Sequence, residues 1–227
     1  MDFVDVLRKR RMVRNYRTDP VPAESIERIV SAARKAPSAG FSQGVSFIVV
    51  TEQRTRRAIA DLAEESGYVA AGFDPWISRA PAHIVVTVSE QAYHDRYQEA
   101  DKLRPDGSEI DWAIPYWWVD AGAALMLVLL GAVNEGLAAG FLGVHSLPGL
   151  RELLEIPPEV TPLGIVTLGL PLPDRRSGSL KRGWKAQDQI VHYERWRPQP
   201  RTSYGQEAHS KSVTKTEDEL PARRADG

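Results

Sequence analysis

The sequence predicts a single domain of mixed α/β or α+β class, because short runs rich in β-branched residues alternate with longer segments of helical periodicity. The runs that read as buried strands are Ser46–Thr51, Ala82–Ser89 and Thr161–Pro171. A chain of 227 residues, 42% of them hydrophobic, is long enough to bury a substantial core around such strands.

Helical spacing of apolar residues predicts the helices that cover these strands. Segment Thr18–Ser38 has two prolines near its start and is expected to stop before Pro37. Its inward face is expected to carry Ile26, Ile29, Val30 and Ala33. The other expected helices are Asp2–Arg11, Gln53–Ser66, Asp120–Leu137 and Leu147–Ile156.

The longest apolar run, Ala121–Val133, lies in the helix expected from Asp120 to Leu137. It is too short to cross a bilayer, which takes roughly 20 residues. A helix that is apolar on all sides is normally buried, so we expect this one in the core or at a subunit interface.

The remaining segments read as connections. Ser89–Trp118 is polar and aromatic and is expected to be an elaborated loop. Ala138–Ser146 reads as a Gly-rich connection and Asp174–Lys185 as a basic loop, whereas Asp188–Trp196 has strand character. Residues 198–227 are polar and lack periodicity, so they read as a disordered tail.

Composition and charge exclude several classes of function. The net charge of −1 indicates no general affinity for nucleic acid or anionic membranes. The chain has no cysteine, which excludes disulfides, thiolate zinc sites and a cysteine nucleophile, and which fits a cytoplasmic protein. The N-terminus has no long apolar stretch and does not read as a signal peptide. No metalloprotease, P-loop, Rossmann or serine-hydrolase motif is found, and no metal is expected.

The segment Leu7–Tyr16, LRKRRMVRNY, concentrates arginines within a short stretch. Three interpretations are open: a solvated helix face, a nucleic-acid patch or an anion pocket. The near-neutral charge of the whole chain disfavours the second. Arg10 follows Phe3 and Leu7 on the stripe expected to face inward, if the helix continues that far. An inward guanidinium must find an anion, because an unpaired buried charge is costly.

Arginine is also the side chain that best fits phosphate oxygens. Arg8, Lys9 and Arg17 are expected to point elsewhere, into solvent. A second basic cluster follows the last expected strand and consists of Arg175, Arg176, Lys181, Arg182 and Lys185. Two such clusters could converge on one phosphate.

Four segments in this order resemble the FMN-dependent nitroreductase family. The first is Arg8–Thr51, with an Arg-rich turn, an aromatic residue, Pro-Val-Pro, a helix and an Ala-Pro-Ser loop that leads into a strand. The second is Val119–Gly143, similar to the family's central dimer helix and its Gly-containing loop. Pro162–Pro171 and Ile190–Trp196 resemble the late strand and the C-terminal extension. The resemblance covers residues 1–197, which we expect to form the FMN-binding domain.

The resemblance implies an α+β fold with a central mixed sheet flanked by helices, in an intertwined homodimer with a C-terminal extension and two FMN sites at the interface. Arg10 matches a phosphate-binding arginine, and Arg11 and Met12 match the positions that follow it. Arg14 matches the basic residue near the N1–C2 edge of the flavin, where its charge would stabilise a developing anion.

Further cofactor contacts are implied in the same way. Pro37, Ser38, Ala39 and Gln43 match the loop that reaches the flavin of the partner subunit. Leu142 and Gly143 match the segment whose backbone approaches flavin N5, where glycine allows close approach. Lys181 and Arg182 are expected to form the second phosphate clamp, with Lys185 as an alternative.

The chain departs from the family pattern at four positions. Met12 stands where serine is usual, and Phe41 stands in place of an asparagine. Gly44 and Val45 replace a Pro-Trp pair. These changes affect recognition of the flavin pyrimidine and are expected to reshape the substrate side.

Aromatic residues near the expected long helix are candidates for binding the acceptor. Trp112, Tyr116 and Trp117 could stack on an aromatic acceptor, or could cover the core beside that helix. Tyr97, Glu99 and Lys102 could hold a zwitterionic substrate, although surface solvation is the alternative.

The family resemblance implies an FMN-dependent oxidoreductase that transfers electrons by a ping-pong cycle from NADH or NADPH to a nitroaromatic, a quinone or a related small organic acceptor. Deiodinase-like or flavin-cleaving branches of the family, and a non-catalytic FMN-binding or storage protein, are the alternatives. No nucleic acid or membrane partner is expected.

Truncation after Arg197 tests the interpretation of the tail. Because residues 198–227 lack a core-forming pattern, the truncated protein should keep the flavin occupancy and the dimer mass of the full chain. Size-exclusion chromatography with an absorption spectrum measures both, and loss of either would show that the tail is structural.

Overall fold

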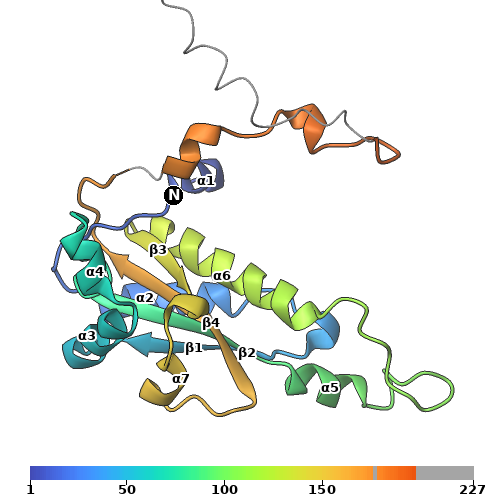
Figure 1. Cartoon of the computed structure of the whole chain (residues 1–227). Helices are drawn as coiled ribbons and strands as arrows, with labels where there is room; N and C mark the ends of the chain where they lie inside the picture. The colour runs from blue at the N-terminus through green and yellow to red at the C-terminus, as the bar shows by residue number, and fades with distance from the viewer. Residues whose placement is uncertain (176–177, 198–227) are drawn as a thin grey trace, which may run out of the picture. The chain divides into compact units, whose positions relative to one another are not determined.

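The computed structural model describes residues 1–175 and 178–197. Residues 1–175 form one compact unit, and residues 178–197 belong to a second. The first unit is an α+β domain around a sheet of four strands in the order β1-β2-β4-β3 (Figure 1). The strands are β1 (Val45–Val50), β2 (Ala82–Ser89), β3 (Ala138–Gly143) and β4 (Val160–Gly169).

All three strand pairs are antiparallel. The α+β class is confirmed. The four-stranded sheet is purely antiparallel, and the parallel pairing in the described residues is one isolated bridge, between Met12 and Ala139. The two central strands, β2 and β4, are almost completely buried, which explains why both read as continuous apolar runs.

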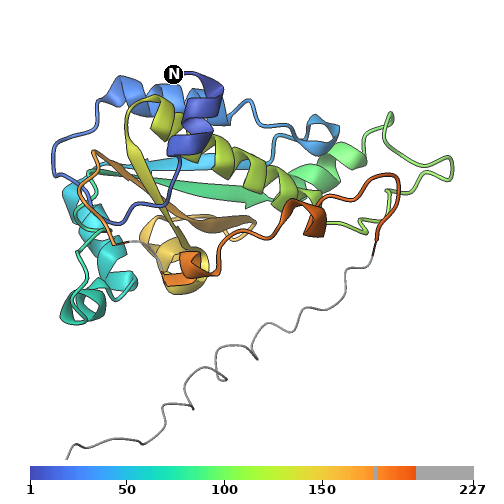
Figure 2. The same cartoon turned by 90° about the horizontal axis from the view of Figure 1, so that it is seen from above.

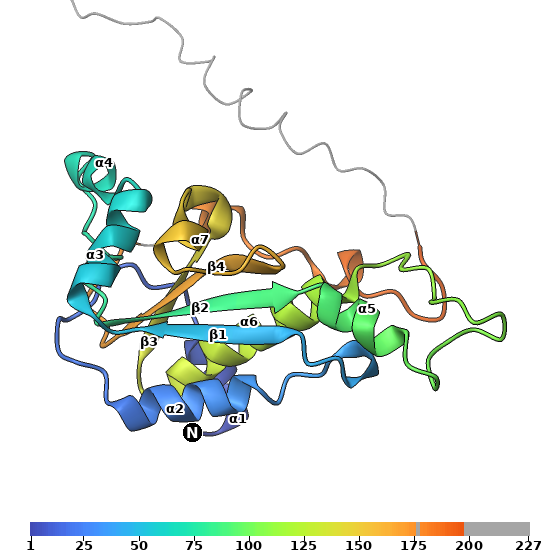
Figure 3. The same ribbon diagram turned by 90° about the horizontal axis from the view of Figure 1, so that it is seen from below.

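Helices cover both faces of the sheet (Figure 3). One face carries α2 (Ala23–Ala33) and α6 (Tyr116–Asn134), and the opposite face carries α3 (Gln53–Leu62), α4 (Glu65–Ala70) and α7 (Leu150–Leu153). Neighbouring strand residues point to opposite faces: Ile84 packs with the α2 and α6 side chains, and Val85 packs with those of α3 and α7.

The inward face expected for α2 is confirmed, since Ile26, Ile29 and Ala33 are buried and Val30 is half-buried. Helix α6 passes the length and composition test for a membrane span, as core helices of soluble proteins also do. It packs on α2 and on all four strands, which accounts for its apolar character. Ile29 packs directly against Gly131, where a Cβ would lie 3.5 Å from the Ile29 Cα.

Two elements replace segments that the sequence predicts to be loops. Ala138–Ser146 contains strand β3, and Ser89–Trp118 contains helix α5 (Gln91–Tyr97). Glycine makes β3 possible at Gly140, because a Cβ there would lie 2.5 Å from the Val13 carbonyl oxygen of the adjacent segment.

Asp188–Trp196 forms no strand in the part of the chain that the structure describes, so the strand prediction is wrong. Short 3₁₀ turns occupy Gly178–Arg182 and Gln187–Gln189 in this second unit. The predicted tail, residues 198–227, lies outside the described residues.

Helix α1 (Phe3–Lys9) is shorter than the predicted Asp2–Arg11. Asp2 caps it by accepting a hydrogen bond from the Val4 N–H at 2.9 Å. The expected inward stripe is wrong for the single chain, because Phe3 is 65% exposed and Leu7 is 47% exposed while Val6 is buried. The chain becomes extended at Arg10, so helical spacing does not set the direction of that side chain.

The buried side chain of His83 lies on β2 and contacts the loop before that strand. Its Nε2 lies 2.9 Å from the Ile77 carbonyl oxygen and therefore donates to it, whereas Nδ1 has no partner among the described residues. Nearby, the Glu65 carboxylate accepts the Ile77 N–H at 2.5 Å. Burial lowers the pKa of His83 from 6.5 to about 4, so this imidazole is neutral in the folded protein.

His83 should make stability depend on pH. Between the unfolded pKa of 6.5 and the folded pKa of about 4 the unfolded chain binds more protons, so the free energy of unfolding falls as the pH is lowered through this range. The loss should reach about 3 kcal/mol. Denaturant unfolding at pH 7 and pH 4.5 measures the free energy of unfolding. It should change less with pH in His83→Gln, which keeps a donor for the Ile77 carbonyl, than in the wild-type protein. Equal slopes for the two proteins would contradict this account.

Candidate functional site

The arginine-rich segment lies along the outer edge of strand β3. The Val13 N–H donates to the Ala139 carbonyl at 3.0 Å, and the close approach at Gly140 lets the two backbones run side by side. Arg10, Arg11 and Arg14 are therefore held on a backbone that is fixed to the sheet.

Tyr16 anchors the end of this segment in the core. Its hydroxyl donates to the Val13 carbonyl at 2.5 Å and lies 2.8 Å from Thr167 Oγ1 on β4. The side chain is fully buried, and burial raises the pKa of Tyr16, which keeps the phenol protonated. Downstream, the Arg17 N–H donates to the Leu170 carbonyl at 2.9 Å.

The arginines of this segment differ in their partners. Arg8 pairs with Asp5 at 2.6 Å and Arg17 pairs with Asp19 at 2.8 Å. Arg10, Arg11 and Arg14 form no ion pair with any carboxylate in the described ranges. The guanidinium groups of Arg8 and Arg17 thus have carboxylate partners, whereas those of Arg10, Arg11 and Arg14 have none among the described residues. The Asp174 carboxylate instead accepts the backbone N–H of Arg14 at 2.8 Å.

The unpaired arginines have different surroundings. Arg10 is half-buried, and Arg11 lines a cavity of about 250 Å³ beside Val133 at the C-terminal end of α6. The Arg14 guanidinium carbon lies 5.7 Å from the centre of the Trp76 ring, within the range of a cation–π contact. Met12 is 38% exposed between them and offers no hydrogen-bond donor.

The loop from Pro37 to Gln43 is fixed at the opposite end of α6. The buried Asp120 carboxylate accepts the Ala39 N–H at 2.8 Å and the Tyr93 hydroxyl at 2.8 Å. The Ser38 hydroxyl oxygen accepts the Gln43 N–H at 3.1 Å, which closes the loop on itself. Burial and the Asp120 carboxylate raise the pKa of Tyr93, so its phenol remains a donor.

One chain does not bring the arginine segment and this loop together. Figures 1 and 2 both show α1 beside the C-terminal end of α6, where the Met1 amino group donates to Asn134 Oδ1 at 3.1 Å. Asp120 holds the loop near the N-terminal end of the same helix. At 1.5 Å per residue, the two anchor points are separated by roughly 20 Å along the helix axis.

Leu142 and Gly143 end strand β3 and are half-buried. Gly143 pairs with Gly164 on β4. A Cβ at Gly164 would lie 2.1 Å from the Leu142 carbonyl oxygen. At Gly143 itself a Cβ would lie 2.8 Å from the His145 ring, so this backbone is approached closely from its own chain. Lys181 and Arg182 lie on the exposed 3₁₀ turn of the second unit, and their place in a phosphate clamp remains a prediction.

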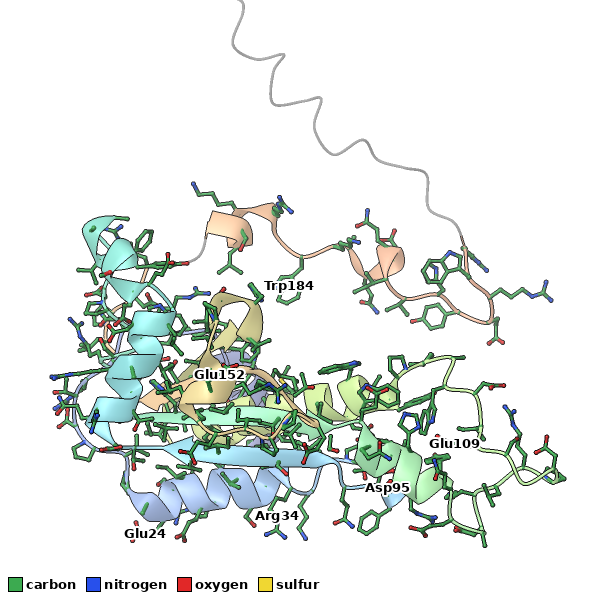
Figure 4. All side chains as sticks on the ribbon, turned by 60° about the horizontal axis from the view of Figure 1, so that its bottom comes forward. Glu24, Arg34, Asp95, Glu109, Glu152 and Trp184 are labelled. Carbon is green, nitrogen blue, oxygen red and sulfur yellow. The ribbon has the colours of Figure 1, made fainter. Side chains whose placement is uncertain are left out.

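The aromatic candidates form a cluster with α5. The ring centres of Trp112 and Tyr97 are 4.6 Å apart, and those of Trp112 and Trp117 are 5.5 Å apart. Trp117 is buried with Tyr93 and Ala121, as expected for a core residue, whereas Tyr116 is 43% exposed. Glu109 accepts from Trp112 Nε1 at 2.5 Å and lies 2.7 Å from His94 Nδ1. The His94 contact ties the Glu109 loop to α5, and Figure 4 shows Glu109 beside that helix.

Sequence reasoning missed the residues that hold the Pro37–Gln43 loop. Asp120 is a lone carboxylate at the start of an apolar helix, which is a signal for a buried polar contact. Arg96 and Tyr97 contact the same loop from α5 and carry no comparable signal, because their helix was not predicted.

Comparisons with known proteins identify the family of the chain. The model of the Nitroreductase family matches residues 7–170. The FMN reductase [NAD(P)H] of Bacillus subtilis is 28% identical over 195 residues, covering 85% of this chain and 74% of that protein. The NADPH-dependent oxidoreductase of Staphylococcus aureus strain MRSA252 is 22% identical over 220 residues, covering 95% and 82% of the two chains.

A solved structure supports the fold. The hypothetical oxidoreductase YcnD from Bacillus subtilis superposes with a TM-score of 0.67 at 26% identity, covering 88% of this chain and 76% of that chain. Because the family model spans most of the described domain, from the arginine segment to the end of β4, the chain belongs to the Nitroreductase family.

Proposed function

We propose that the chain passes electrons from NAD(P)H through FMN to a nitroaromatic, a quinone or a related small organic acceptor in a ping-pong cycle. Its reaction class, an NAD(P)H-dependent flavin oxidoreductase, and its FMN cofactor follow from the family and from relatives named for these properties. The acceptor, the kinetic order and a cytoplasmic location are the proposed part.

The observation that carries the proposal is the set of unpaired arginines on the β3 edge. Arg10 and Arg11 supply donors for a phosphate, which matches an anionic mononucleotide better than a neutral ligand. Arg14 would place a positive charge at the flavin pyrimidine edge, and Leu142 and Gly143 would present backbone near N5. The donor set therefore fits FMN.

When bound, FMN supplies the hydride chemistry, and the protein supplies binding, orientation and charge. The positive charge of Arg14 would stabilise negative charge that develops near the pyrimidine edge of the flavin. For a nitroaromatic acceptor the overall change is balanced: NAD(P)H gives a hydride, which carries two electrons and one proton, and solvent gives a second proton. The products are NAD(P)⁺, a nitroso compound and water.

A homodimer is the proposed assembly. Phe3, Val4 and Leu7 on α1 are 65%, 67% and 47% exposed, and Val119 and Met126 on α6 are 54% and 45% exposed. Apolar surface of this extent on two neighbouring helices favours burial by a partner. The arginine segment of one subunit and the Pro37–Gln43 loop of the other would then share one flavin.

The absorption spectrum of the purified protein, with mass identification of the released chromophore, tests the cofactor. Steady-state NAD(P)H oxidation with a nitroaromatic and a quinone tests the activity, and parallel double-reciprocal plots are expected for a ping-pong cycle. A yellow protein without turnover on any acceptor would instead favour an FMN-binding or storage protein.

Replacing Arg10 should weaken FMN binding more than replacing Arg8. Arg10→Ala removes a donor that has no internal carboxylate, and loss of a charge-assisted contact should raise the FMN dissociation constant by roughly ten- to a hundredfold.

Arg8→Ala is the matched control, because it breaks only the exposed pair with Asp5 and should change the dissociation constant little. Fluorescence titration of the apoprotein measures both constants. Equal effects of the two substitutions would refute the assignment of Arg10.

A further inference from the structure

The loop that carries Phe41 has an unusual backbone. Gly40, Phe41 and Gln43 have φ values of 61°, 60° and 52°. Left-handed backbone is open to glycine, but a bulky side chain such as phenylalanine adopts it only at a cost in stability. Such strain persists where the surrounding structure imposes it, and it is frequent at functional sites.

Contacts from two helices hold this loop in place. From α6, Asp120 accepts the Ala39 N–H at 2.8 Å. From α5, Arg96 Nε donates to the Gly40 carbonyl at 2.9 Å, and the Tyr97 ring covers Gly40 so closely that a Cβ there would lie 2.6 Å from Tyr97 Cε2. Both helices therefore fix the two residues that immediately precede Phe41.

The strained conformation does not bury the Phe41 ring, which is 74% exposed in the single chain. It lines a cavity of about 530 Å³, together with Pro37, Ser38, Gln43 and Phe47. This volume lies within the range of small-molecule sites. An exposed aromatic ring that is held at a cost beside a cavity points to a bound partner for the ring.

The charge around the cavity narrows the class of ligand. Arg34 and Lys35, which directly follow α2, also line it, and Figure 4 shows Arg34 at that end of the helix. Neither residue forms an ion pair with a described residue. No aspartate or glutamate is among the lining residues. The cavity thus combines an aromatic face with uncompensated positive charge.

We propose that Phe41 determines acceptor specificity: its ring stacks on a planar aromatic acceptor, and Arg34 and Lys35 favour an acceptor with an anionic substituent. This inference rests on the proposed function, because the Pro37–Gln43 loop is the segment expected to reach the flavin. Nitrobenzoates are simple representatives of the class.

The first test substitutes asparagine, which tolerates left-handed backbone. Phe41→Asn should raise Tm, because strain is relieved. It should also lower the ratio of kcat/KM for 4-nitrobenzoate to kcat/KM for ferricyanide, which cannot stack, by roughly tenfold. Phe41→Tyr should retain the wild-type ratio.

Glu155→Asn is the matched control. Glu155 is exposed, has φ 52° and follows α7, on the opposite side of the sheet from α2. This variant should raise Tm without changing the kinetic ratio, which separates relief of strain from loss of stacking.

The second test addresses charge. In Arg34→Gln/Lys35→Gln, the preference for 4-nitrobenzoate over the uncharged 4-nitrobenzamide should fall by roughly three- to tenfold at low ionic strength. An unchanged preference would refute the role of the two cations.

Two results would overturn the role of Phe41: an unchanged ratio in Phe41→Asn, or conversion of that variant to a monomer, which would make Phe41 a subunit contact. A wild-type protein that binds no FMN, or oxidises no NAD(P)H with either acceptor, would refute the proposed function itself, and this inference with it.

Discussion

The packing of α6 against α2 and the whole sheet is the constraint on which the rest of the structure depends. Its apolar side chains form the shared core of the face that carries α2, and Gly131 lets the two helices approach closely. Two candidate half-sites, the arginine segment and the Pro37–Gln43 loop, are attached to opposite ends of α6. Asn134 holds the N-terminus near the arginine segment, and Asp120 holds the Pro37–Gln43 loop. The separation between these two attachment points is therefore set by the length of α6.

The arginines differ in whether their guanidinium groups have a carboxylate partner among the described residues. Arg8, Arg17, Arg28 and Arg96 each have a carboxylate partner close by, with side chains at least partly in solvent. Such exposed pairs add little stability. The three arginines fixed along β3 lack this compensation within the described residues, which leaves their donors available to an anionic ligand. The structure thus shows which arginines have a carboxylate partner, and this cannot be read from the number of basic residues in the sequence.

The sequence predicts most of the elements because their signals are local. The β-branched runs of β1, β2 and β4 and the apolar periodicity of α2 and α6 all correspond to observed elements. Strand β3 was missed because Ala138–Gly143 consists mainly of alanine and glycine, which have weak strand propensity. Its formation depends on contact with Val13, far away in the sequence, and such a contact has no local signal.

The candidate site was predictable to a similar extent. The family resemblance identified the arginine segment, the loop and the end of β3, but not the side chains that hold them. Asp120 and Tyr93 act on the loop through tertiary hydrogen bonds. Likewise, the inward direction inferred for Arg10 assumed that the first helix continues through that residue, whereas α1 ends at Lys9. The availability of the Arg10 side chain therefore follows from the absence of a carboxylate partner among the described residues and not from helical spacing.

The placement of the two half-sites on opposite ends of α6 has a consequence for mixed assemblies. In the proposed homodimer, each flavin draws on one end of this helix from each subunit. A subunit damaged in its arginine segment, paired with one damaged in its Phe41 loop, would therefore concentrate both defects in one site and leave the other site wholly intact. If two inactive proteins of this kind exchange subunits, each mixed dimer would contain one intact flavin site. Up to half of the normal number of flavin sites would then be recovered.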